Sequence, residues 1–113
     1  MQFLLIISHD DSFVPTDSLF HDIGRWIEAA ERRGIRLYGS PLRPAGDATT
    51  VRVRDGKVML KSGPFANSKE KMCAYELIEC ANKAEAIEVA SQHPMASVAT
   101  IEVRPVWVEL AGR

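Results

Sequence analysis

Three polar residues that follow one another closely have the side-chain types needed for acid–base chemistry on a small molecule. They are Lys69, Glu70 and Tyr75. A lysine supplies positive charge, a glutamate can take a proton, and a phenol can donate a hydrogen bond to an oxyanion. The same residues are equally consistent with a surface ion pair followed by a tyrosine in the wall of a sheet. We keep both interpretations open.

Histidine is the other source of acid–base chemistry, because its unperturbed pKa lies near neutrality. His9 precedes Asp10 and Asp11, a cluster with the chemistry of a metal or acid–base site, or of a polar loop leaving a strand. His93 precedes Pro94, where a helix should end. It is therefore either a pocket residue or a cation favoured by the helix C-terminus. No zinc-ligand spacing is present, so we expect no metal site.

Residues 49–61 predict a β-hairpin. Asp55 and Gly56 form the two-residue turn, because both tolerate positive φ. That register pairs Val53 with Val58 and gives the hairpin one apolar face, which we expect to pack inward. The opposite face is basic and is typical either of an anion-binding surface or of a solvated edge that resists further strand pairing. Its residues are Arg52, Arg54, Lys57 and Lys61.

The remaining elements must position these groups. Apolar runs and alternation predict strands at 2–8, 35–42, 74–80 and 101–110. Helical periodicity predicts helices at 16–33 and 82–92. The apolar face of the first helix, which should point inward, carries Leu19, Ile23, Trp26, Ile27 and Ala30. Without the hairpin the order is βαββαβ, the ferredoxin-like α+β arrangement. Two helices cover one sheet face, and the apolar residues on the other face predict a homodimer that packs sheet against sheet.

Length and composition limit the class of protein. A chain of 113 residues with 46% hydrophobic and 26% charged residues predicts a single soluble domain over 1–113. The net charge of −1 does not favour nucleic-acid binding. No apolar run is long enough for a membrane span or has the flanks of a signal peptide. Cys73 and Cys80 flank a strand that holds them roughly 23 Å apart, so we expect free thiols and a cytoplasmic protein.

Four segments in one order carry a resemblance to a known family. They are Ser62-Gly63-Pro64-Phe65, Lys69-Glu70, Tyr75-x-Leu77-Ile78-Glu79 and Glu102-Val103-Arg104-Pro105. Together they resemble the YCII-related family, specifically its DGPF branch. The resemblance implies a ferredoxin-like fold that dimerises into a shared α/β barrel, with a largely unestablished molecular function. Barrel relatives include small enzymes acting on ring-shaped or lactone-like substrates, and genes of the DGPF branch often lie beside sigma factors.

The chain departs from the family pattern at several positions. Ser62 stands where the motif begins with Asp. Either that carboxylate was an acid or base that this chain lacks, or it accepted turn hydrogen bonds, which serine also does. We favour the second interpretation. In the broader family a histidine of the first helix and an aspartate before the helix-ending proline resemble a catalytic pair. Ile23 and His93 occupy those positions here.

Two functional hypotheses follow. The first is a small-molecule-binding homodimer with acid–base chemistry of the isomerase or lyase type and no organic cofactor. Its catalytic candidates are Glu70, Tyr75 and His93, and its ligand-binding candidates are Arg52, Ser62, Phe65, Lys69 and His9. The alternative is a non-enzymatic interaction module with a sigma-factor-linked protein partner in transcriptional regulation. The sequence does not decide whether the protein is an enzyme.

Overall fold

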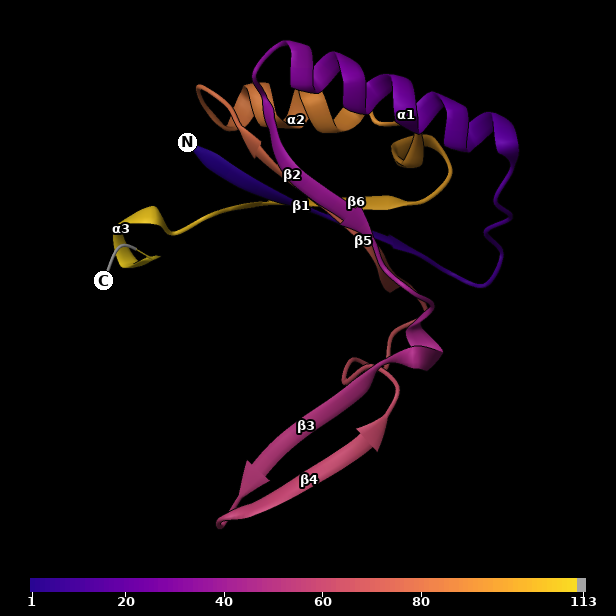
Figure 1. The fold of residues 1–113 in the computed structure, drawn as a ribbon, viewed down its shortest axis with the longest axis vertical. Coiled ribbons are helices and arrows are strands. Elements are labelled where there is room, and N and C mark those ends of the chain that lie inside the picture. The colour runs from indigo at the N-terminus through magenta and orange to yellow at the C-terminus, as the bar shows by residue number, and fades with distance from the viewer. Residues whose placement is uncertain (112–113) are drawn as a thin grey trace.

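A four-stranded antiparallel sheet and two helices form the body of the protein. The computed structural model describes residues 1–111 (Figure 1). The strands are β1 (Gln2–His9), β2 (Arg36–Pro41), β3 (Thr49–Arg54), β4 (Lys57–Ser62), β5 (Lys71–Glu79) and β6 (Thr100–Pro105). The α-helices are α1 (Asp17–Arg32), α2 (Lys83–Ser91) and the short α3 (Val108–Ala111), and 3-10 turns lie at η1 (Ala45–Asp47) and η2 (Pro94–Ser97).

The strand order of the main sheet is β2-β5-β1-β6, and every neighbouring pair is antiparallel. With β3 and β4 set aside, the element order is βαββαβ, so the α+β class is confirmed and the topology is compatible with a ferredoxin-like fold. The last strand is shorter than predicted. It ends at Pro105, and α3 replaces the expected continuation to residue 110, because proline offers no N–H to extend the ladder.

The core lies between one face of the sheet and helices α1 and α2, which lie on the same side of the sheet (Figure 1). Phe3, Leu5 and Ile78 point to this side and are fully buried. Trp26 of α1 packs beside them and donates from Nε1 to the backbone oxygen of Val89 at 3.1 Å, which ties α1 to α2. The predicted inward face of α1 is confirmed. Its members Leu19, Ile23, Trp26, Ile27 and Ala30 are buried or half-buried.

Side chains at the ends of both helices satisfy backbone N–H groups that the helices leave free. Thr16 accepts from the N–H of Leu19 at 3.1 Å at the start of α1. Asn82 accepts from the N–H of Glu85 at 2.9 Å, and the Glu85 carboxylate in turn accepts from the N–H of Ala81. These contacts confirm the two predicted helix starts.

The opposite face of the main sheet carries apolar side chains that no helix covers. The register places Leu4 opposite Leu77, and Ile6 opposite Tyr75. These four residues are half-buried, and the exposed Tyr38 lies beside Tyr75 with ring centroids 6.1 Å apart. We call this surface the open face.

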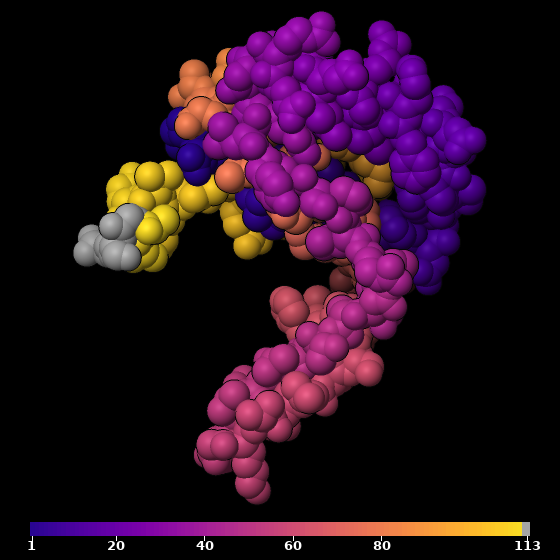
Figure 2. Space-filling view, in the orientation of Figure 1, coloured from indigo at the N-terminus to yellow at the C-terminus, as the bar shows by residue number. Residues whose placement is uncertain are grey.

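Strands β3 and β4 form a separate hairpin, here called the arm (residues 49–62), that projects from the body (Figures 1 and 2). Its turn has the predicted positive φ at Asp55 and Gly56, and the pairing of Val53 with Val58 is confirmed. The expectation that the valine face packs inward is wrong for the single chain. Val53 and Val58 are 56% and 67% exposed, because the arm extends beyond the sheet and meets no core surface.

Candidate functional site

A cavity of about 1010 Å³ lies on the helix side of the sheet. Ile23, Gly24 and Ile27 of α1 form one wall, Ile7 of β1 forms another, and Met95 of η2 contributes a third. Apolar side chains therefore provide much of the surface, as is usual for a small-molecule pocket. A few ionisable side chains interrupt it. They are His9, Asp11, Arg36, Arg43, Lys71, Cys73, Glu76 and His93.

A buried ion pair lies in this cavity wall. Glu76 of β5 is 4% exposed, and its Oε2 accepts from Nε of Arg36 at 2.5 Å. Arg36 also donates through Nη1 to the exposed Glu31 at 2.8 Å. Burial opposes the charge on Arg36, but its bonds to Glu76 and Glu31 outweigh that cost and raise its pKa. Burial raises the pKa of Glu76, and Arg36 offsets this only in part.

Gly39 of β2 makes room for the Glu76 carboxylate. The two residues are cross-strand partners. A Cβ at Gly39 would overlap with that carboxylate and would lie 2.7 Å from the backbone oxygen of Tyr75. A glycine within a strand often marks such a close approach. The Glu76 carboxylate thus lies against the backbone of β2 at Gly39 and accepts a hydrogen bond from Arg36.

His93 lies in the wall next to α1 and is 2% exposed. Its Nδ1 accepts from the N–H of Met95 at 3.0 Å, so the proton of the neutral ring is on Nε2. No residue within 1–111 accepts from Nε2, and the ring meets Trp26 edge-on with centroids 4.6 Å apart. Burial lowers the pKa of His93 to about 4, so a neutral ring fits this position better than the alternative of a cation at the helix end.

His9 and its acidic neighbours lie at one edge of the cavity. The His9 ring stacks on Phe13 with centroids 4.6 Å apart, and Nδ1 lies 2.8 Å from the backbone oxygen of Asp10. The hydroxyl and backbone N–H of Ser12 both donate to Asp10 and lower its pKa. Over the described part of the chain, no group of three or more histidines, cysteines and acidic residues is arranged to hold a metal ion.

The other candidates from the sequence do not line this cavity. Lys69 and Glu70 are exposed in the segment before β5, and Phe65 is 75% exposed. Arg52 and Ser62 belong to the arm. Tyr75 points to the open face, where burial raises its pKa. Of the eight candidates, only His9 and His93 line the cavity.

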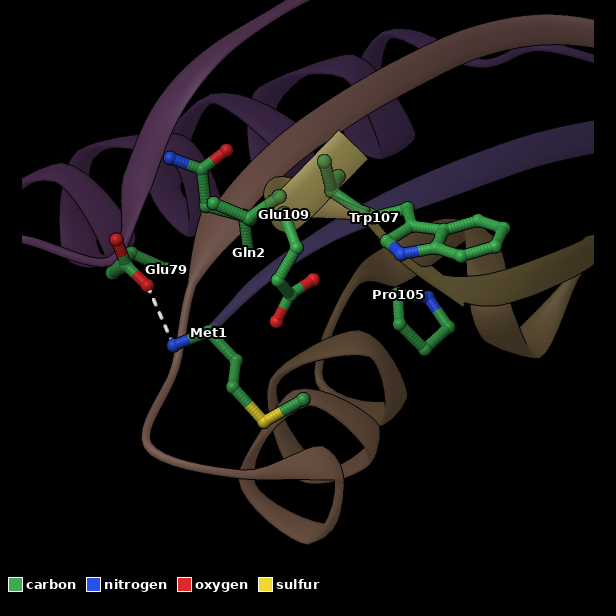
Figure 3. Close-up of a pocket in the computed structure, with 8 residues that line it drawn as sticks. Met1, Gln2, Glu79, Pro105, Trp107 and Glu109 are labelled. Atoms are coloured by element: carbon green, nitrogen blue, oxygen red, sulfur yellow. Dashed lines mark ion pairs between the residues drawn. The ribbon is translucent and has the colours of Figure 1, made fainter. Parts of the chain in front are cut away.

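A second cavity of about 650 Å³ lies where the end of β6 meets α3 (Figure 3). The Met1 amino group pairs with Glu79 at 2.8 Å on one side, and Pro105 and Trp107 lie on the other. Both members of the pair are about half exposed, so water competes with any ligand for them. The larger cavity, with its buried polar groups, is the better candidate site.

The sequence interpretation did not include Arg36, Gly39 and Glu76. Two signals in the sequence could have identified Glu76 and Gly39. Glu76 stands two residues before Ile78 in an alternating strand, which places a carboxylate on the buried face. Gly39 interrupts an otherwise regular strand, which indicates a close approach of another group.

Comparison with known proteins gives the family. The family model for the YCII-related domain matches residues 1–109. An uncharacterized protein of Rhizobium meliloti (strain 1021) is 37% identical over 120 residues, covering 99% of this chain and 97% of the relative. The chain therefore belongs to the YCII-related family. Among residues 1–111, no helix has the length and apolarity to cross a membrane.

Proposed function

We propose that this protein binds a small molecule in the cavity beneath α1 and acts on it by proton transfer, as isomerases and lyases do. The observation that carries the proposal is the pairing of an apolar cavity with a buried carboxylate in its wall. Buried ionisable groups with perturbed pKa values gather at functional sites more often than elsewhere. His93 and His9 remain site candidates because they line the same cavity.

Gly24 offers a direct test of binding in this cavity. It lines the cavity, and a Cβ built there would meet no atom within 4 Å. Gly24→Phe should fill the space, whereas Gly24→Ala should leave it open and serve as the matched control. We expect the apolar probe 2-methoxynaphthalene to shift the amide NMR signals of Ile23 and Ile27 in the control and not in the phenylalanine variant. Equal shifts in both variants would contradict the proposal.

We further propose that the open face packs against a second copy of the chain, which would close a dimeric α/β barrel. Leu4, Ile6 and Leu77 supply apolar area, and Glu102 pairs with Arg104 beside them. A face with both charge signs can pair with itself across a two-fold axis. Leu77→Glu should give a monomer by native mass spectrometry. Ile87→Glu, at an exposed apolar residue of α2, should not.

The arm favours a second candidate function, a protein-interaction module. Its faces are exposed and chemically distinct, with Val51, Val53, Val58 and Leu60 on one side and basic residues on the other. An isolated two-stranded hairpin is marginally stable, so contact with an acidic protein, such as one linked to a sigma factor, would stabilise it. Val53→Ser with Val58→Ser should abolish capture of such a partner while leaving binding of the cavity probe intact.

We also propose a branch of the family and a cellular location for this protein. Gly63, Pro64 and Phe65 support placement in the DGPF branch of the family. The thiols of Cys73 and Cys80 are free, which supports a reducing, cytoplasmic location.

A further inference from the structure

The buried ion pair in the cavity wall needs an explanation other than stability. Taking two charged groups out of water has a large free-energy cost. Replacing a buried ion pair by apolar residues is therefore often neutral or stabilising. Glu76 and Arg36 nevertheless lie in a wall shared with Ile7 and Ile27, and Gly39 accommodates the carboxylate. This arrangement fixes the position of one carboxylate against the cavity.

One oxygen of that carboxylate is available to a ligand. Arg36 occupies Oε2 of Glu76, and no residue within 1–111 hydrogen-bonds to Oε1. Arg36 also balances the negative charge, so a cationic ligand gains little from this site. At the rim, Arg43 pairs with Asp47 at 2.8 Å, which reduces its attraction for anions. Beside Ile7 and Ile27, Oε1 of Glu76 thus gives the cavity a fixed hydrogen-bond acceptor in apolar surroundings.

We infer that the ligand is an uncharged, largely apolar molecule with a hydroxyl group, which donates its hydrogen bond to Oε1 of Glu76. Its hydrocarbon part packs against Ile7, Ile23 and Ile27. This inference rests on the proposed function and names the class of ligand for the same cavity. It adds Glu76 as the group that binds the ligand and Arg36 as the residue that positions Glu76.

Two probes of nearly the same shape test the inference. At neutral pH, 2-naphthol has a hydroxyl donor, and 2-methoxynaphthalene carries a methyl group in place of that hydrogen. A hydrogen bond to a charged acceptor should make 2-naphthol bind the wild type about tenfold or more tightly. Calorimetry gives the two dissociation constants, and amide shifts at Ile23 and Gly24 locate both probes in the cavity.

Variants then identify the acceptor. Glu76→Gln alone would leave Arg36 buried without its charge partner and risks unfolding. We therefore choose the double variant Arg36→Met with Glu76→Leu, which removes both charges together. It should bind both probes with similar affinity. Glu31→Gln removes only the charge of the outer partner of Arg36, so this matched control should keep the preference for 2-naphthol.

The outcomes separate the inference from the proposed function. Equal binding of the two probes in the wild type, with shifts at the cavity residues, would overturn the role of Glu76 and leave the cavity as a binding site. A preference for 2-naphthol that survives in the double variant would also overturn that role. If neither probe shifts the cavity residues, binding in the cavity is refuted and the inference fails with it.

Discussion

Acid should destabilise this protein through His93, because the folded state holds that ring neutral. Burial lowers its pKa from an ordinary 6.5 to about 4, while the unfolded chain binds a proton at the ordinary value. Between these two pH values the unfolded state therefore binds more protons, and stability rises with pH. At about 1.36 kcal/mol per pKa unit, the contribution lost on acidification from pH 7 is about 2 kcal/mol at pH 5 and about 3 kcal/mol at pH 4.

The matched variant for this prediction is His93→Asn. The His93 side chain caps η2 by accepting from the N–H of Met95, and asparagine also caps well but does not titrate. Urea unfolding at several pH values should show that the wild type loses about 2 kcal/mol more than the variant between pH 7 and pH 5. Glu76 contributes with the opposite sign, since its raised pKa favours the protonated folded state as pH falls. That contribution is common to both proteins and cancels in the difference.

Histidine NMR provides an independent readout. The ring of His93 should remain neutral down to about pH 4, so its signals should change little between pH 7 and pH 5. The reasoning is refuted if His93 titrates near its ordinary value of 6.5. It is equally refuted if wild type and His93→Asn show the same pH dependence of stability, because burial would then not hold the ring neutral.

Three further predictions concern single side chains, each checked by the free energy of unfolding in urea. Gly24→Ala should stabilise the protein by about 1 kcal/mol, since alanine favours the helix interior and its Cβ enters open space; a loss of stability would contradict this. Gly39→Ala should cost about 1–3 kcal/mol, because its Cβ overlaps with the Glu76 carboxylate; a neutral effect would show that the carboxylate moves freely. Asn82→Ala should cost about 1 kcal/mol through loss of the bond to Glu85, and Asn82→Ser should recover most of it.

The sequence predicted correctly those parts of the fold that depend on residues close to one another in the chain. The Asp55-Gly56 turn set the register of the arm, and the periodicity of α1 placed Trp26 and Ala30 in the core. The predicted end of β6 was wrong by several residues. Apolar residues continue past Pro105 in the sequence, but the strand ends there because proline has no N–H to donate to the neighbouring strand.

The candidate site was harder to predict, since strands distant in sequence build it. Arg36 and Glu76 belong to different strands and meet only when β2 pairs with β5. The long insertion between these strands hides that pairing in the sequence. The candidates taken from the family motif, including Lys69 and Glu70, instead fall in an exposed segment. Motif membership identified the family, and the three-dimensional pairing identified the cavity residues.

Strand β5 links the two proposed surfaces of this protein. Its alternating side chains place Glu76 on the cavity side and the neighbours Tyr75 and Leu77 on the open face. A second copy packed on the open face would hold β5 from behind and restrict movement of the Glu76 backbone. Dimerisation would then favour ligand binding without adding a contact to the ligand, by reducing the conformational freedom lost on binding. On this reasoning Leu77→Glu weakens binding of 2-naphthol, although its side chain lies on the far side of the sheet.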